Sequence, residues 1–381
     1  MNGPRPNGPR PRGRVVTIAA LATAITLALA GTGCTAAPAA SGQVAGTARS
    51  ASVVDAALPA PRPQYVALAD AVLAHGGQVW VEADLVKAWL AGPQRYHEVL
   101  DVVIAFVQRP GIAGVKIADE LGYGDGLDPA QALAFLKETT TALHARAPGR
   151  KVLADLIVPE LGCLDWRPGA SATTGSPGAT ASPTGQPSLS ASGVFASQRT
   201  CGEIQRAKYP AATLAAVDVE IAEGGLDVVD LSAGLRADQQ YLDWGTTRDA
   251  AMEAIWVEAS RRWSRHVTLQ ARKALAHPGP STDSAAAAER DVHTFVDIPL
   301  AHGASAVDIW TWSAPYKGGT YQLTDPGLAD NALMRALRSR EAKGVHLWTH
   351  MSPSFLQKGL EPDVAAAIQT FGTIFVASGT G

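Results

Sequence analysis

Residues 307–312 read Val-Asp-Ile-Trp-Thr-Trp, a stretch that alternates aliphatic or small side chains with a carboxylate and two indoles. Successive side chains of a β-strand point to opposite faces, so Asp308, Trp310 and Trp312 are expected to share one face. A strand buried on both faces normally reads as a continuous apolar run. The polar and aromatic second face therefore indicates a strand that lines a binding site.

Six further runs follow the same rule, and they lie at 79–84, 115–120, 152–158, 226–232, 267–272 and 345–350. In each run one parity is aliphatic, and the other becomes polar or aromatic toward the C-terminal end. Helical patterns alternate with these runs, at 93–108, 129–146, 203–223, 246–263, 284–301 and 328–341. Asp128 as N-cap and Pro129 at the first helical position mark one helix start. This alternation predicts a parallel α/β fold.

Seven strands and one more would close a single (β/α)8 barrel of the TIM type. Residues 373–377 supply the best eighth strand, and the helix pattern at 64–75 would fill the gap left because no helix follows them. The alternative is an open doubly wound sheet, whose strands are more uniformly apolar and whose first strand leads into a glycine-rich phosphate loop. No such loop follows the run at 79–84. The sequence therefore favours the barrel.

Composition narrows the class of protein. The chain has 381 residues, of which 46% are hydrophobic and 18% charged, which is typical of a globular domain with a sizeable core. The net charge is −3, and no dense group of lysines and arginines lies beyond the N-terminus. Nucleic acid is therefore not expected as a partner.

The N-terminus reads as an export signal. Four arginines precede an uncharged stretch at 15–30, which is shorter than the roughly 20 residues of a membrane span and suits a signal peptide. The small residues before Cys34 resemble a bacterial lipoprotein cleavage site, although Gly31 stands where that family usually has Leu. The resemblance implies a signal peptide at 1–33, lipidation of Cys34 and anchoring to the outer face of the cell membrane. Cleavage after Ala39, giving a secreted protein, is the alternative.

Residues 34–62 read as a disordered tether, and the barrel domain is expected over 63–381.

The remaining cysteines suggest a disulfide. Cys163 and Cys201 bracket a low-complexity insertion at 164–200 that is rich in Ser, Thr, Ala, Gly and Pro. Such a segment buries too little apolar surface to fold alone, and an exported chain favours a disulfide between the two cysteines. Two free buried thiols are the alternative.

The active site of a (β/α)8 barrel lies at the C-terminal ends of its strands. The polar parity predicts a set of side chains around this mouth, namely Glu82, Asp84, Lys116, Glu120, Asp230, Gln270, Arg272, Trp312, Trp348 and His350. Indoles stack on sugar rings, and carboxylates and amides hydrogen-bond hydroxyl groups, so this set predicts a carbohydrate pocket. Asp155 and Asp308 lie deeper and are expected to be structural, and Trp310 is expected to pack in the core.

Two strand ends resemble those of TIM-barrel glycoside hydrolases, namely Ile-Ala-Asp-Glu at 117–120 and Trp-Thr-Trp at 310–312. The resemblance implies that Glu120 is the proton donor, with Glu82 or Asp230 as the second carboxylate, in the hydrolysis of a poly- or oligosaccharide. The chain departs from the family pattern at Asp119, where Asn is expected. Its strand order would also be permuted, and a further strand carries Gln270 and Arg272 where the nucleophile should lie.

These departures leave other functions open. A non-catalytic surface lipoprotein that binds a carbohydrate or cell-wall ligand fits the missing nucleophile, and a barrel hydrolase or lyase of different chemistry fits the set of charges. Glu120 would then form an ion pair with Lys116 or Arg272. No cofactor is expected. His346 and His350 would lie about 13 Å apart along a strand, too far to share a metal ion, although one of them with Asp308 remains an alternative.

Overall fold

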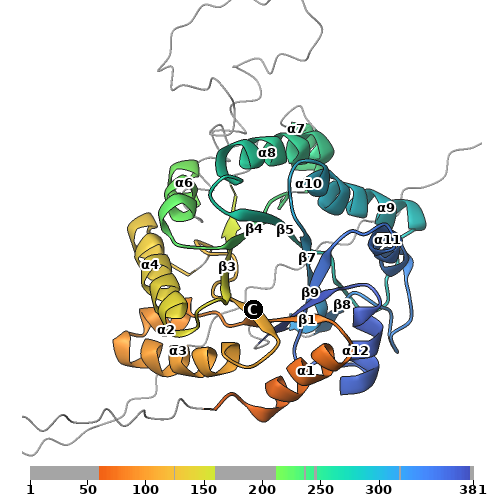
Figure 1. Cartoon of the computed structure of the whole chain (residues 1–381). Coiled ribbons are helices and arrows are strands. Elements are labelled where there is room, and N and C mark those ends of the chain that lie inside the picture. Colours follow the sequence, from red (N-terminus) through yellow and green to blue (C-terminus); the bar gives the residue numbers. More distant parts are fainter. Residues whose placement is uncertain are drawn as a thin grey trace, which may run out of the picture. The chain divides into compact units, whose positions relative to one another are not determined.

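In the computed structural model of the protein, the described residues are 60–123, 125–158, 212–235, 237–243, 247–316 and 319–377. Within them eight parallel strands close into a barrel, seen end-on in Figure 1. The barrel strands are β1 (Gln78–Glu82), β2 (Ile112–Lys116), β3 (Lys151–Ile157), β4 (Val228–Ser232), β5 (Thr268–Ala274), β7 (Val307–Tyr316), β9 (Leu347–Met351) and β10 (Thr373–Ala377). The strand order is β5-β4-β3-β2-β1-β10-β9-β7, and β5 pairs with β7 to complete the ring. The predicted (β/α)8 barrel is confirmed, and the open sheet is excluded.

Helices surround the barrel and connect its strands (Figure 1). They are α1 (Pro63–Ala74), α2 (Val86–Leu90), α3 (Pro93–Val107), α4 (Pro129–Arg146), α6 (Leu214–Glu223), α7 (Asp238–Asp243), α8 (Arg248–Trp263), α9 (Ala285–Val292), the π-helical turn η2 (His293–Asp297), α10 (Ile298–Ala301), α11 (Ala332–Glu341) and α12 (Leu360–Ile368). The start of α4 is as predicted, because Asp128 and Gln131 form a reciprocal capping box and Pro129 opens the helix. The short helices α2 and α7 and the longer α12 were not anticipated.

The first helix occupies the place that the barrel leaves open at its C-terminal strand. Helix α1 contacts β1, β10 and α12, so it covers the junction where a helix after β10 would otherwise pack. The prediction for residues 64–75 is confirmed. Among the helices of the described residues, none is long and apolar enough to cross a membrane.

The two parities of the strands have the predicted separate environments. The aliphatic parity packs against the helices in the main core, as Val79, Val115 and Ile309 illustrate. The other parity fills the barrel, and its lower part is an apolar floor of five residues, Trp80, Leu153, Val228, Trp348 and Phe375. Gly114 makes room for this floor, because a Cβ there would lie 2.5 Å from the Trp80 ring.

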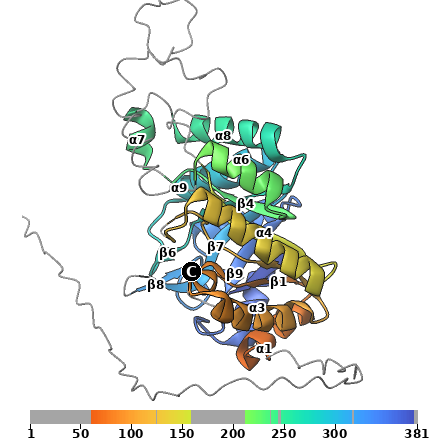
Figure 2. The ribbon, with the colours of Figure 1, turned by 90° about the vertical axis from the view of Figure 1, so that its left-hand side faces the viewer.

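A hairpin extends the barrel beyond β7. Strand β8 (Gly319–Gln322) pairs antiparallel with the C-terminal part of β7, and β6 (His277–Pro278) pairs with β8. Figure 2 shows β6 and β8 on the same side of the barrel as α7. The register between β7 and β9 shifts between Ile309 and Ser313. Because side chains alternate along a strand, such a shift changes which residues of β7 point into the barrel.

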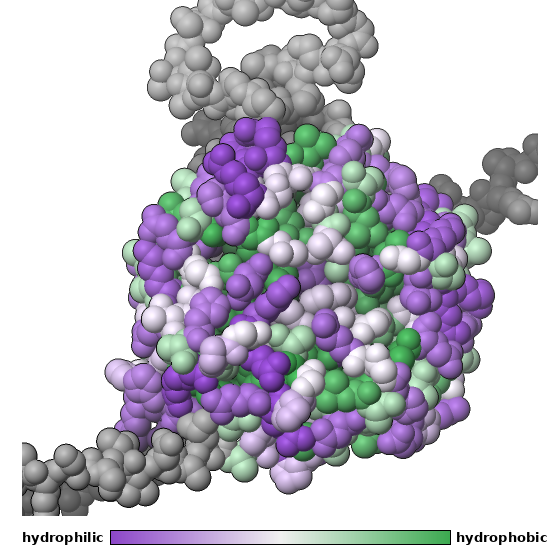
Figure 3. Space-filling view, viewed as in Figure 1, coloured by the Kyte–Doolittle hydropathy of each residue, from purple (hydrophilic) through white to green (hydrophobic). Residues whose placement is uncertain are grey.

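Several predictions lie outside the described residues. They concern the signal peptide, the tether up to residue 59, the lipidation of Cys34 and the insertion at 164–200 with Cys163 and Cys201. These predictions stay as they were made. Figure 3 shows the end-on view of the barrel in space-filling form, with hydrophilic residues around the rim and apolar residues further in.

Candidate functional site

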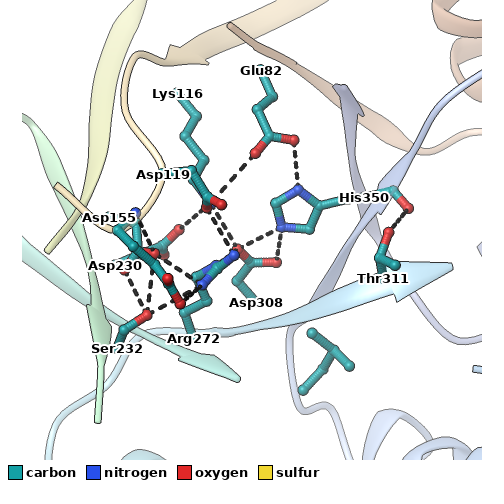
Figure 4. A network of polar contacts seen from close by, with 12 residues as sticks. Glu82, Lys116, Asp119, Asp155, Asp230, Ser232, Arg272, Asp308, Thr311 and His350 are labelled. Carbon is teal, nitrogen blue, oxygen red and sulfur yellow. Dashed lines mark hydrogen bonds and ion pairs between the residues drawn. The ribbon is translucent and has the colours of Figure 1, made fainter. Parts of the chain in front are cut away.

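A layer of charged side chains lies above the apolar floor, at the C-terminal ends of the strands (Figure 4). It contains six carboxylates and three cations, which are Glu82, Asp119, Glu120, Asp155, Asp230, Asp308, Lys116, Arg272 and His350. These residues come from seven of the eight barrel strands or from the segment that follows β2. The barrel topology therefore brings together groups that are far apart in the sequence.

Lys116 occupies the centre of the layer. Its ammonium lies 3.0 Å from Asp119, 3.5 Å from Asp308 and 3.7 Å from both Glu82 and Asp230, and its side chain is fully buried. Burial acts to lower the pKa of Lys116, but the surrounding carboxylates outweigh it and raise the pKa well above its usual value. The lysine is therefore charged and serves as the common counter-ion of four acids.

Arg272 holds the carboxylates on the other side of the layer. Its guanidinium lies 2.8 Å from Asp119, 3.0 Å from Asp155 and 3.1 Å from Glu120. Burial acts to raise the pKa of Asp119, but Arg272 and Lys116 outweigh it and lower the pKa to about 2. Asp119 is thus ionised at any ordinary pH.

His350 bridges two carboxylates. Its Nδ1 lies 2.6 Å from Glu82 Oε2, and its Nε2 lies 2.8 Å from the Asp308 carboxylate. Burial acts to lower the pKa of His350, but Asp308 and Glu82 outweigh it and raise the pKa to about 9. At neutral pH the ring is therefore an imidazolium that donates from both nitrogens. The result is a chain of groups, Asp308–His350–Glu82, that ends at the mouth.

Two buried aspartates, Asp155 and Asp230, have raised pKa values, in contrast to Asp119. Burial raises the pKa of Asp155 to about 7, although its carboxylate accepts from the Ser232 hydroxyl and the Glu120 backbone N–H. Burial and the neighbouring Asp308 raise the pKa of Asp230 well above its usual value, and neither of its carboxylate oxygens has a hydrogen-bond partner. Both residues lie inside the barrel and are fully buried.

A cavity opens beside this layer, between the ends of β1, β7 and β9. Its polar lining consists of Glu82, Asp84, Asp119, Thr311, Ser313, His350 and Ser352, with Trp310 at one wall. Burial raises the pKa of Asp84, and Lys87 counteracts the effect. Lys116 and Arg272 do not line the cavity. Three carboxylates and the His350 ring therefore face the cavity, and Lys116 and Arg272 lie behind them.

The structure separates the predicted site residues into three groups. Glu82, Asp84 and His350 line the cavity as predicted. Lys116, Asp230, Gln270 and Arg272 converge on the barrel interior, where they are at most 7% exposed and do not line the cavity. Glu120 has its carboxylate against Arg272 and is also absent from the cavity lining, so the alternative of an ion pair describes it better than the role of proton donor. Its backbone φ of 48° is a conformation that a non-glycine residue adopts at a cost.

Two predictions on tryptophans were wrong. Trp312 is fully buried, and its Nε1 donates to Asp363 at 2.9 Å, because the register shift in β7 turns it away from the barrel. Trp348 belongs to the apolar floor, with its ring 5.2 Å from that of Trp80. Trp310, expected in the core, lines the cavity instead.

Four polar residues of the cavity were missed, namely Asp119, Thr311, Ser313 and Ser352. Asp119 was read only as a substitution in a motif, although its position directly after β2, next to Glu120, could have indicated it. Ser313 lies in β7 just after the register shift, and Ser352 directly follows β9. No sequence pattern marks either residue. In the described part of the chain, no group of three or more histidines, cysteines, aspartates or glutamates has the geometry to hold a metal ion.

Comparison with known proteins supports the fold only. No protein-family model and no curated protein matches the sequence. Among solved structures, a putative phosphonomutase from Burkholderia cenocepacia matches with 12% identity, 82% of this chain and 92% of that chain covered, and a TM-score of 0.41. The carboxyl transferase domain of Rhizobium etli pyruvate carboxylase matches with 12% identity, 80% and 40% covered, and a TM-score of 0.40. A 2,3-dimethylmalate lyase of the PEP mutase/isocitrate lyase superfamily matches with 11% identity, 82% and 77% covered, and a TM-score of 0.36.

The chain spans well under half of the pyruvate carboxylase chains that it matches. At this identity and TM-score the likeness extends no further than the (β/α)8 barrel. These similar structures are mutase, lyase and carboxyl transferase barrels, not glycoside hydrolases.

The predicted resemblance to glycoside hydrolases, and with it the hydrolysis or non-catalytic binding of a carbohydrate, was wrong. The site agrees with this correction. Glu120, the expected proton donor, is paired with Arg272 outside the cavity, and Trp312, the expected sugar platform, lies on the helix side of the barrel wall. The predicted membrane anchor at Cys34 lies outside the described residues and is not decided by these observations.

Proposed function

We propose that the chain is an acid–base enzyme that moves a proton on a small organic molecule bound at the mouth of the barrel, with Glu82 as the base. The observation that carries this proposal is the Asp308–His350–Glu82 chain, with 2.8 Å and 2.6 Å contacts. The side chain of Glu82 is 11% exposed at the cavity, whereas His350 is 2% exposed. Glu82 is therefore the member of the chain that meets a substrate.

The neighbours of Glu82 orient it for this task. One carboxylate oxygen accepts from His350, and the other lies 3.7 Å from Lys116. Both contacts hold the carboxylate at the strand end. A base needs this orientation, because a proton is transferred only over hydrogen-bond distance.

Asp84 supplies the complementary acid. It follows Glu82 by two residues, which corresponds to about 7 Å along an extended chain, and it lines the same cavity. Burial raises the pKa of Asp84, and Lys87 counteracts the effect. Two carboxyl groups at one cavity can take a proton from one atom of a substrate and return one to another. Such a pair suits an isomerisation or an elimination.

The experiment measures proton abstraction without requiring the natural substrate. Hydroxyacetone, aminoacetone and pyruvate are incubated with the full chain in D2O, and deuterium incorporation at carbon is followed by NMR against the buffer rate. We expect exchange with at least one of the three. Glu82→Gln should lower its rate by at least about 100-fold, the range found for removal of a general base. Glu223→Gln, at an exposed position paired with Lys137, should leave the rate unchanged. Exchange that persists in Glu82→Gln would contradict the proposal.

A further inference from the structure

The carboxylates around the cavity are more exposed than the cations that neutralise them. The carboxylates that line the cavity reach solvent, with Asp84 24%, Asp119 17% and Glu82 11% exposed. The cations Lys116 and Arg272 are 0% and 6% exposed and do not line the cavity. The His350 ring does line it, but its side chain is only 2% exposed and both of its nitrogens contact carboxylates. A ligand in the cavity therefore meets negative charge first.

Two hydroxyl groups point to a ligand independently of the carboxylates. Ser313 and Ser352 line the cavity and are only 2% and 4% exposed. Among the described residues, neither hydroxyl oxygen has a hydrogen-bond partner. A buried hydroxyl without a partner costs free energy, so its presence in a cavity indicates a group that a bound molecule satisfies.

The indole of Trp310 adds an aromatic wall to the same cavity. Aromatic faces attract cations through the ring quadrupole. Carboxylates, unpaired hydroxyls and an indole together form the chemistry that recognises an ammonium group, which donates hydrogen bonds to the oxygens and lies against the ring. A divalent metal ion is the other cation to consider, but the cavity residues lack the geometry of a metal site among the described residues.

We propose that this cavity binds the ammonium group of a small amine, so that the molecule on which Glu82 acts carries a positive charge. The assignment of a substrate, as distinct from a bound ligand, rests on the proposed function. Asp119 and Glu82 supply the negative charge, and the hydroxyls of Ser313 and Ser352 accept from the ammonium.

A series of three ligands of equal length tests the charge preference. Propylammonium, propan-1-ol and propionate are titrated against the full chain, and dissociation constants are obtained by ligand-detected NMR. We expect propylammonium to bind at least about tenfold more tightly than propan-1-ol, and propionate to bind more weakly than either. Equal affinity for the three, or a preference for propionate, would overturn the proposal. Displacement of propylammonium by millimolar Mg²⁺ would assign the cavity to a metal ion and overturn it as well.

Variants identify the groups that bind. Asp119→Asn is avoided, because Asp119 pairs with both Lys116 and Arg272. The double variant Ser313→Ala/Ser352→Ala should weaken propylammonium binding about three- to tenfold without lowering the denaturation midpoint, because neither hydroxyl has a partner to lose. Ser305→Ala, whose hydroxyl donates to the Leu269 carbonyl, is the matched control and should leave the affinity unchanged. Unaltered affinity in the double variant would overturn the role of the hydroxyls.

The two proposals fail separately. Selective propylammonium binding without deuterium exchange into any ketone would refute the acid–base function and leave the amine site intact. Exchange into hydroxyacetone or pyruvate, without a preference for aminoacetone, would refute the amine site and leave the acid–base function intact.

Discussion

In the lower half of the barrel, Trp80 and Trp348 pack ring to ring, whereas two residues further along the same strands Glu82 and His350 meet through a 2.6 Å polar contact. These two pairs of residues lie on the same two strands, β1 and β9, at different heights in the barrel. Side chains two residues apart point the same way and lie about 7 Å apart along the strand. In barrels of this type, the lower end is associated with stability and the upper end with catalysis.

Phe375 joins the two layers. Its ring lies 5.3 Å from that of Trp348 below and stacks at 4.8 Å on the ring of His350 above. The ammonium of Lys116 lies 5.4 Å from the same ring. The apolar floor therefore supports the charged layer directly, and it shields the layer from water on that side.

The largest expected effect on stability comes from the floor. Trp80→Ala should lower the free energy of unfolding by about 3–5 kcal/mol, because it leaves a cavity among packed aromatic rings. Urea denaturation measures the change. Leu90→Ala, at an apolar residue that is 47% exposed, is the control and should have little effect. An unchanged midpoint for Trp80→Ala would refute the structural role of the floor.

The charged layer should instead make stability depend on pH. The folded-state pKa of His350, about 9, exceeds its ordinary value of 6.5, so folding favours the protonated ring. This stabilisation is complete below pH 6.5 and is lost as the pH rises through about 9, a change on the order of 3 kcal/mol.

The comparison of variants tests that assignment. In His350→Gln the free energy of unfolding should vary less with pH between 6.5 and 9 than it does in the unaltered chain. His97→Gln, at an exposed residue on α3, should retain the full dependence. An equal slope in His350→Gln would contradict the imidazolium between Glu82 and Asp308.

A smaller loss of stability is expected at Trp312, which was predicted to face the mouth of the barrel but faces the helices. Trp312→Phe removes the hydrogen bond to Asp363 and should cost about 1–2 kcal/mol of stability. Affinity for propylammonium and deuterium exchange should stay the same, because Trp312 does not line the cavity. Trp310→Ala should do the reverse and weaken ligand binding with little change in stability. If Trp312→Phe lost ligand binding and Trp310→Ala did not, the placement of Trp312 outside the cavity would be contradicted.

The barrel itself was predictable from local patterns. The alternation at 79–84 or 345–350 and the cap at Asp128 are properties of neighbouring residues, and they determine strand faces and a helix start without reference to the rest of the chain. The same parity correctly assigned Glu82 and His350 to the mouth. These features depend on spacing alone.

The errors arose where distant residues decide the outcome. Trp312 faces the helices because β7 shifts register against β9, and a register is a property of two strands. Glu120 was assigned a catalytic role from the resemblance of one strand end, and the sequence could not decide between that role and an ion pair with Arg272, 152 residues away. Ser313 and Ser352 became recognisable only through the absence of a partner for either hydroxyl.

The central claim is that Glu82 acts mainly in catalysis and adds much less to stability than the apolar floor does, and two measurements on one variant test it most directly. Glu82→Gln keeps the size of the side chain, and we measure both its rate of deuterium exchange into the ketone that the unaltered chain accepts and its urea denaturation midpoint. The account predicts a loss of at least about 100-fold in exchange, with a fall in stability well below that of Trp80→Ala. Undiminished exchange together with a large loss of stability would show that Glu82 merely fills the barrel, and would contradict the account.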